Sequence, residues 1–314
     1  MSLFLKKMKT KQKIAEMIVD FSQSQDLKRV PKTTKNFLRL VILDWISVAL
    51  AGQKEPVSKL IKKVETHKGS KEAFVIGMVD RLPAKSASFI NAVIGHALDY
   101  DDTHFGSLGH AGTVVISSVL AASDKKKSSI KEFKEAILIG METAIRIGIW
   151  LGRKHYHQGF HITATAGIFG STVAVSRILG LSRKQTINAI GIAASFSSGI
   201  KAQFGSMAKP LQVGMAAARG FESALMAEKG IKADTKILDK SNGYGKTYSA
   251  DFNPWAFSKL GKKFFIEDLK FKFHACCHGT HSAIEALIYL RDKNQLEYNL
   301  IDEIKIITNP QYLK

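Results

Sequence analysis

Apolar side chains recur every three to four residues through most of the chain up to Gly230, which predicts a mainly helical protein. The expected helices span 10–22, 33–52, 57–67, 83–97, 113–122, 129–152, 163–179, 182–195 and 213–227. Thr33 or Thr34 is a suitable N-cap for the second helix, and Ser128 or Ser129 for the long one that starts at 129. The last three helices are rich in Ala, Gly, Ser and Val, so we expect them to pack closely together.

The pattern changes after Gly230. Residues 266–273 alternate between apolar and polar as a strand does, 281–292 has helical spacing, and 301–308 predicts a second strand. A strand, a helix and a strand are typical of an α/β unit, here with at least one partner strand missing. We therefore expect a large all-helical domain over 1–265 and the start of a smaller, truncated α/β domain over 266–314.

Composition excludes several classes of protein. Hydrophobic residues make up 45% of the chain, as in a globular protein. Lys and Arg number 46 against 27 Asp and Glu, a formal net charge of +19, but the lysines are spread along the chain without interleaved aromatic residues. That distribution is typical of a solvated surface and does not favour nucleic-acid binding.

Cysteine usage and hydropathy indicate the compartment. Cys276 and Cys277 are adjacent, so they cannot join distant segments, and this favours a reducing compartment. The longest runs of low charge, 160–176 and 189–200, contain several Ser and Thr and do not predict a membrane span. The N-terminus has no long apolar segment followed by a cleavage site. We expect a cytoplasmic protein with no membrane partner.

Ionisable residues concentrate between Gly95 and Gly112, where three Asp and three His lie between two apolar segments. Buried charge is costly unless it is paired or used, so the cluster indicates a functional site. If the incoming helix continues, Asp99 and Thr103 share one of its faces at i, i+4, and a carboxylate can orient His110 or His104 as an acid–base group. The alternative is that the carboxylates cap a turn and the histidines lie on the surface.

Two further concentrations of polar residues follow. His161 begins a small-residue helix whose first N–H groups favour an anion, although a histidine bonded only to backbone fits equally well. Lys209 precedes another such helix. Residues 272–281 contain two Cys and three His, but adjacent cysteines are poor ligands for one tetrahedral ion, and no metal is expected. Dinucleotide, nucleotide and serine-hydrolase motifs are absent from the sequence.

As a set, these motifs resemble the MmgE/PrpD family and occur in the same order along nearly the whole chain. They are Leu98-Asp99-Tyr100-Asp101-Asp102-Thr103 with His110, Gly159-Phe160-His161, Lys209-Pro210-Leu211, and Lys272-Phe273-His274-Ala275-Cys276-Cys277-His278-Gly279-Thr280-His281. The family includes 2-methylcitrate dehydratases, cis-aconitate decarboxylases and an iminodisuccinate epimerase. The resemblance implies an all-helical domain, an α/β lid, a homodimer, and chemistry without a metal or organic cofactor.

The resemblance also assigns roles to individual residues. It implies catalysis by His110 with Asp99 and Thr103, and substrate binding by His161, Lys209, Lys272 and Tyr312. We accordingly expect a lyase that dehydrates a citrate-like polycarboxylate such as 2-methylcitrate, in propionate catabolism, with His110 as the acid–base group. The alternatives are an epimerase or a decarboxylase acting on a related di- or tricarboxylate. Because family members are usually longer, a truncated, non-catalytic homologue that dimerises is a further alternative.

Overall fold

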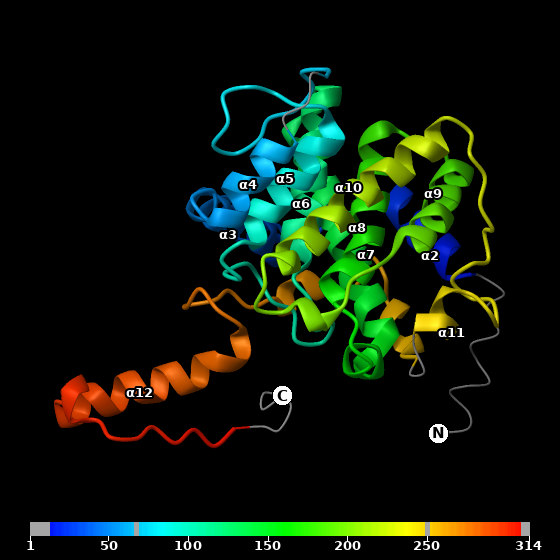
Figure 1. Cartoon of the computed structure of the whole chain (residues 1–314). Helices are drawn as coiled ribbons and strands as arrows, with labels where there is room; N and C mark the ends of the chain where they lie inside the picture. The colour runs from blue at the N-terminus through cyan, green and yellow to red at the C-terminus, as the bar shows by residue number, and fades with distance from the viewer. Residues whose placement is uncertain (1–12, 66–68, 249–251, 309–314) are drawn as a thin grey trace, which may run out of the picture.

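A computed structural model describes residues 13–65, 69–248 and 252–308 and confirms a mainly α-helical fold (Figure 1). The helices are α2 (Ile14–Ser24), α3 (Lys32–Gly52), α4 (Pro56–Val64), α5 (Ala84–His96), α6 (Ala111–Lys126), α7 (Ile130–His157), α8 (Ile162–Leu179), α9 (Arg183–Phe196), α10 (Ala208–Glu228), α11 (Tyr244–Tyr248) and α12 (His281–Asn294). Short 3-10 helices are η1 (Leu27–Arg29), η2 (Lys201–Gln203), η3 (Pro254–Phe257), η4 (Phe265–Asp268), η5 (His278–Thr280) and η6 (Tyr298–Leu300).

Helix α8 lies in the middle of the bundle, packed against α6, α7, α9 and α10. Glycines permit this close approach. A Cβ on Gly170 would lie 2.6 Å from the carbonyl oxygen of Gly140 in α7, and a Cβ on Gly220 in α10 would lie 2.6 Å from that of Ile168. The predicted close packing of small-residue helices is confirmed. By length and hydropathy α8 resembles a membrane span, but 89% of it is buried inside the bundle, as in a core helix.

Helix ends differ in part from the predicted ones. Ser129 caps α7 as expected, because its Oγ accepts a hydrogen bond from the backbone N–H of Glu132. Gly152 does not end α7; its φ of 75° produces a kink, and the helix resumes as far as His157. The predicted threonine cap of α3 is wrong. Pro31 occupies the N-cap, and the buried Thr34 side chain instead donates a hydrogen bond to Glu267.

Neither predicted strand forms a sheet in the described part of the chain. The segment expected as a strand over 266–273 begins inside η4, and its one ladder contact is an isolated bridge between Thr103 and Lys270. Residues 301–308 have no ladder partner among the described residues. Alternation alone cannot make a strand, since a strand also needs a neighbour to satisfy its backbone groups. The predicted domain boundary at residue 265 stays a prediction.

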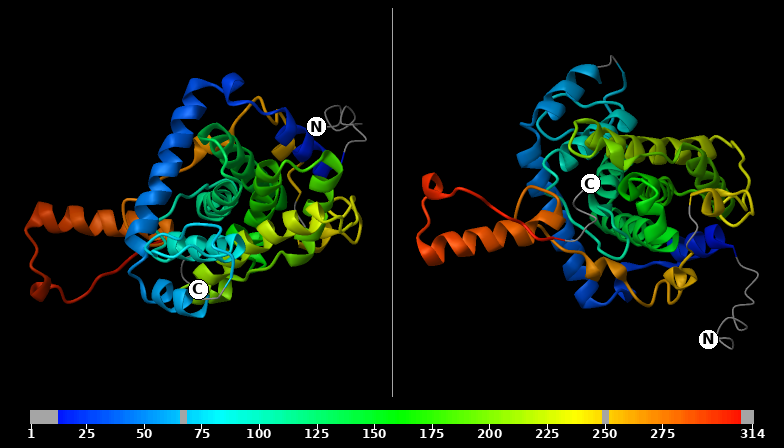
Figure 2. Two further views of the ribbon diagram at one scale, coloured as in Figure 1. Left: turned by 90° about the horizontal axis from the view of Figure 1, so that it is seen from above. Right: turned by 60° about the horizontal axis from the view of Figure 1, so that its bottom comes forward.

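The last part of the chain leaves the bundle. Both views in Figure 2 show α12 running away from the other helices and the segment after it turning back in the opposite direction. Apolar side chains are exposed there, among them Tyr298, Leu300 and Ile307. The residues before α12 behave differently: Phe265, Ile266 and Leu269 are buried in the core of the bundle. The bundle core therefore extends through η4.

A buried ion pair on α7 holds the segment that precedes α12 against the bundle. Arg146 Nε lies 3.0 Å from Glu142 Oε2, and both side chains are almost fully buried. Arg146 donates further hydrogen bonds to the carbonyl groups of Ala256, Ser258 and Lys263. Glu142 accepts one from the backbone N–H of Ile266. The two charges thus neutralise each other, and their hydrogen bonds to residues 256–266 fix the path of this segment across α7.

Replacing Glu142 with Gln should lower the free energy of unfolding by about 3–5 kcal/mol, because the Arg146 guanidinium would stay buried without a counter-charge. Asp20→Asn is the matched control, since its partner Arg183 and Asp20 itself are about half exposed; we expect at most about 1 kcal/mol there. Urea denaturation followed by tryptophan fluorescence measures both. Equal effects of the two substitutions would contradict the assigned role of the buried pair.

Candidate active site

The charged stretch forms a loop between two helices of the core. Helix α5 ends at His96, and α6 begins immediately after His110. Asp99 has a φ of 47°, in the left-handed region, so the helix does not continue and the predicted i, i+4 arrangement of Asp99 and Thr103 is wrong. The two residues are instead brought to His110 by the path of the loop. Thr103 and Lys270 exchange two backbone hydrogen bonds, of 2.9 and 2.8 Å, which hold the loop against the segment that follows η4.

Three helix N-termini meet at one cavity of about 400 Å³. His110 is the N-cap of α6, His161 is the N-cap of α8, and Lys209 lies in the first turn of α10. All three side chains line the cavity, together with His96, Asp99 and Phe204. The partial positive charge at a helix N-terminus stabilises anions. The backbone therefore favours a negatively charged ligand in this cavity.

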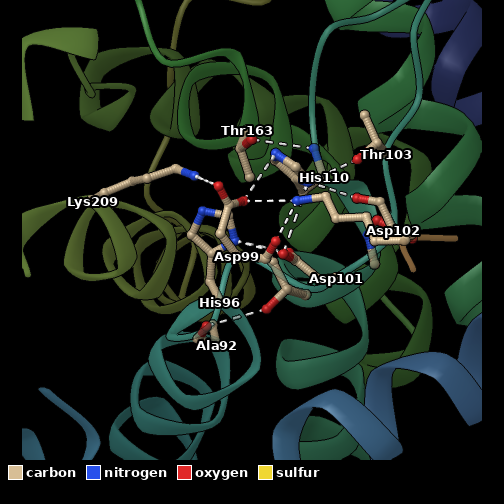
Figure 3. Close-up of polar contacts among 12 residues, drawn as sticks. Ala92, His96, Asp99, Asp101, Asp102, Thr103, His110, Thr163 and Lys209 are labelled. Carbon is tan, nitrogen blue, oxygen red and sulfur yellow. Dashed lines mark hydrogen bonds and ion pairs between the residues drawn. The ribbon is translucent and has the colours of Figure 1, made fainter. Parts of the chain in front are cut away.

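Asp99 is the centre of charge in the site (Figure 3). Its Oδ2 lies 2.8 Å from Lys209 Nζ and its Oδ1 lies 2.9 Å from Lys272 Nζ, while His110 Nε2 is 3.8 Å from Oδ1. Burial alone would raise the pKa of Asp99, but His110, His96 and the two lysines together lower it well below its usual range. Asp99 is accordingly ionised, and it holds the two ammonium groups close together.

His110 is held in one tautomer. Its Nδ1 lies 2.6 Å from the carbonyl oxygen of Asp102, which can only accept, so Nδ1 carries the hydrogen and Nε2 has a lone pair. Thr103 Oγ1 is 3.4 Å from the same Nδ1, and the backbone N–H of His110 donates to Thr163 Oγ1. Burial lowers the pKa of His110 to about 3. His110 is therefore a neutral imidazole that can accept a proton at Nε2.

Two more imidazoles complete the cavity wall. His161 Nδ1 lies 2.8 Å from Gln212 Oε1, and burial lowers its pKa to about 3. His96, which the motif comparison did not single out, contacts both carboxylate oxygens of Asp101 through Nδ1 at 3.0 and 2.8 Å. Its ring centroid is 5.1 Å from that of His110 and 6.0 Å from that of His161. The count of histidines in the 95–112 stretch is the signal that could have identified His96.

The predicted site residues hold different positions around the cavity. Those that line it are Asp99, His110, His161 and Lys209. Thr103 and Lys272 are buried behind this wall and contact His110 and Asp99, respectively. From the 272–281 segment, Cys277 also reaches the cavity. Tyr312 lies outside the described residues.

One group of three side chains in the described chain is close enough to hold a cation. The ligand atoms of His96, Asp99 and Asp101 lie within 4.8 Å of one another. Two ammonium groups already contact Asp99, however, and they would repel a metal ion there. The charges of the cavity suit an anion, and they fit a carboxylate best because Lys209 and Lys272 already hold one.

Comparison with known proteins identifies the family. The family model "MmgE/PrpD N-terminal domain" matches residues 16–255. Similar proteins are a cis-aconitate decarboxylase-like protein of Aspergillus oryzae, 28% identical over 88% of this chain and 61% of the relative, and the cis-aconitate decarboxylases of Mus musculus (29%, 80% and 53%) and Homo sapiens (28%, 87% and 60%). The chain belongs to the MmgE/PrpD family. It spans between about half and three-fifths of the length of these relatives.

Proposed function

We propose that this protein is a lyase that acts on a citrate-like tricarboxylate, and that its reaction is the release of CO₂ from cis-aconitate. The ion pairs of Asp99 with Lys209 and Lys272 carry the proposal, because they show that the site holds a carboxylate between two cations. The names of the relatives support decarboxylation over the other reactions of the family. No metal or organic cofactor is needed for the steps that follow.

The substrate carboxylates have three places to bind. Lys209 faces the cavity directly, His161 closes the wall beside it, and the N-termini of α6, α8 and α10 point toward the same volume. About 400 Å³ is within the range for small-molecule sites. A bound carboxylate competes with Asp99 for its ammonium partners, so a substrate with several carboxylates gains most from this cavity.

The same cations stabilise the charge that the reaction creates. Loss of CO₂ next to a carbon–carbon double bond leaves an electron pair that spreads toward a neighbouring carboxylate. Lys209 lines the cavity, where it can stabilise this charge without reorganisation of solvent, and Lys272 adds positive charge from behind Asp99. A proton must then reach carbon from a group in the cavity. His110, whose pKa the charge of the bound substrate raises, adds a further positive charge beside this anion.

Dehydration of 2-methylcitrate is the second candidate, favoured by the state of His110. A dehydratase must remove a proton from carbon, and the lone pair on His110 Nε2 is suited to accept it. Both reactions use one tricarboxylate site and differ in the bond that breaks. An epimerase would exchange the carbon-bound proton and release neither CO₂ nor water.

The function is tested by incubating the purified chain with cis-aconitate and measuring CO₂, and with 2-methylcitrate and measuring the absorbance of the unsaturated product. We expect His110→Gln to lower kcat about 10²–10⁴-fold and Lys209→Gln mainly to raise KM. His157→Gln, an exposed histidine on α7, is the control and should retain full activity. A chain that converts neither substrate, or a His110→Gln variant with normal kcat, would refute the proposal.

We also propose that the protein is a homodimer that associates through its helical bundle. Helix α3 lies at the edge of the bundle in Figure 1 and exposes Leu40, Leu43 and Leu50, with exposed fractions of 49%, 59% and 51%. Their spacing places them along one stripe of the helix, and an exposed apolar stripe favours association.

Light scattering after size-exclusion chromatography should give the mass of a dimer for the wild type and that of a monomer for Leu43→Lys, because a lysine would place a charge within the apolar contact. Ile130→Lys is the control, since Ile130 is similarly exposed at the start of α7. A monomeric wild type, or a Leu43→Lys variant that stays dimeric, would exclude this interface.

A further inference from the structure

His96, which lines the cavity, forms a buried pair with Asp101 behind it, and the functions of His110 and the lysines leave the role of this pair open. His96 is 1% exposed and Asp101 is 1% exposed. The carboxylate meets His96 Nδ1 with both oxygens, at 3.0 and 2.8 Å, and therefore fixes the orientation of the ring. A carboxylate that orients an imidazole in this way is a recurring arrangement in acid–base catalysis.

The other ring nitrogen of His96 has no protein partner. His96 lines the cavity, and its Nε2 is buried without a hydrogen bond to any described residue. Figure 3 shows this nitrogen on the side of the ring away from Asp101. A buried polar atom without a partner costs free energy, and native structures keep such atoms mainly where a ligand or a reaction uses them. The unpaired Nε2 is thus placed to meet a molecule in the cavity.

The reaction needs a proton that neutral His110 does not hold. The Asp102 carbonyl keeps the hydrogen of His110 on Nδ1, so its Nε2 has none to give. The pair of His96 and Asp101 can hold one. Burial lowers the pKa of His96 and raises that of Asp101. Both shifts favour the form in which Asp101 keeps its proton, donates it to Nδ1, and leaves a hydrogen on Nε2 of the neutral ring.

Other titratable groups surround His96. They are His110 at the start of α6, His161 at the start of α8, Lys209 at the start of α10, Asp99 on the loop, and Lys272 behind Asp99. The lysines disfavour a positive charge on the ring, and Asp99 opposes them. Burial and the two lysines together favour a neutral His96 ring, and burial raises the pKa of Asp101 although the lysines lower it.

We propose that His96, oriented by Asp101, is the proton donor of the reaction, with the proton leaving from Nε2. The inference rests on the proposed lyase function. In decarboxylation, the bond to the departing CO₂ breaks, its electron pair ends on carbon, and that carbon takes the proton from Nε2. The proton of Asp101 passes to Nδ1 at the same time. The pair is left with one proton and a negative charge, and it regains a proton from water after the product leaves.

Two substitutions separate the donor role from a structural one. In His96→Asn the side-chain amide oxygen can still accept the hydrogen bond of protonated Asp101, but nothing replaces Nε2. In His96→Gln the amide reaches toward the position of Nε2 but cannot transfer a proton. We expect both to lower kcat about 10²–10⁴-fold with little change in KM, and to bind propane-1,2,3-tricarboxylate as the wild type does. Asp101→Asn should also lower kcat and shift the pH profile, and His157→Gln should leave both unchanged.

The outcomes are distinct. An active wild type whose His96→Asn variant keeps kcat within tenfold would overturn the donor role and leave the proposed function intact. A wild type inactive on every polycarboxylate would overturn both. If the variants do not fold, nitrogen NMR of the His96 ring in the wild-type chain decides the matter. A hydrogen on Nε2 in the empty site supports the proposal, and a hydrogen on Nδ1 alone contradicts it.

Discussion

One carboxylate between two ammonium groups organises the site. Asp99 comes from the loop after α5, Lys209 from the start of α10, and Lys272 from the segment that follows η4. Without Asp99 the two lysines would repel each other, and without the lysines the partly buried carboxylate would take up a proton. The arrangement therefore keeps two cations close together and ready for an incoming anion. Burial keeps the neighbouring imidazoles neutral, and an incoming anion opposes that effect.

The bundle makes this arrangement possible in two ways. Glycines at Gly140, Gly170 and Gly220 let the core helices approach closely enough for three N-termini to reach one cavity. The buried pair of Glu142 and Arg146 then holds the returning chain against α7, and the bridge between Thr103 and Lys270 follows a few residues later. Lys272 owes its position to these contacts. The side chains that line the cavity are thus carried by helices of the core and by a loop held between them, as precise positioning requires.

The sequence allowed most of the helices to be predicted, because a buried helix repeats its apolar positions over many residues. The two strands could not be predicted reliably, since alternation over eight residues does not reveal whether a neighbour is present. The motifs led to Asp99, His110, His161 and Lys209, which the structure brings to one cavity. They did not lead to His96. Its importance depends on an unpaired ring nitrogen and a contact with Asp101, and neither can be read from composition or spacing.

The central claim is that the cavity binds a polycarboxylate on Lys209 and the surrounding neutral imidazoles. Calorimetric titration with propane-1,2,3-tricarboxylate at pH 6, in two buffers of different ionisation enthalpy, measures both the affinity and the protons exchanged. We predict binding with net uptake of protons, because an anion raises the pKa of His110 and His161, and weaker binding by Lys209→Gln. Absence of binding, or binding that releases protons and ignores Lys209→Gln, would contradict the account.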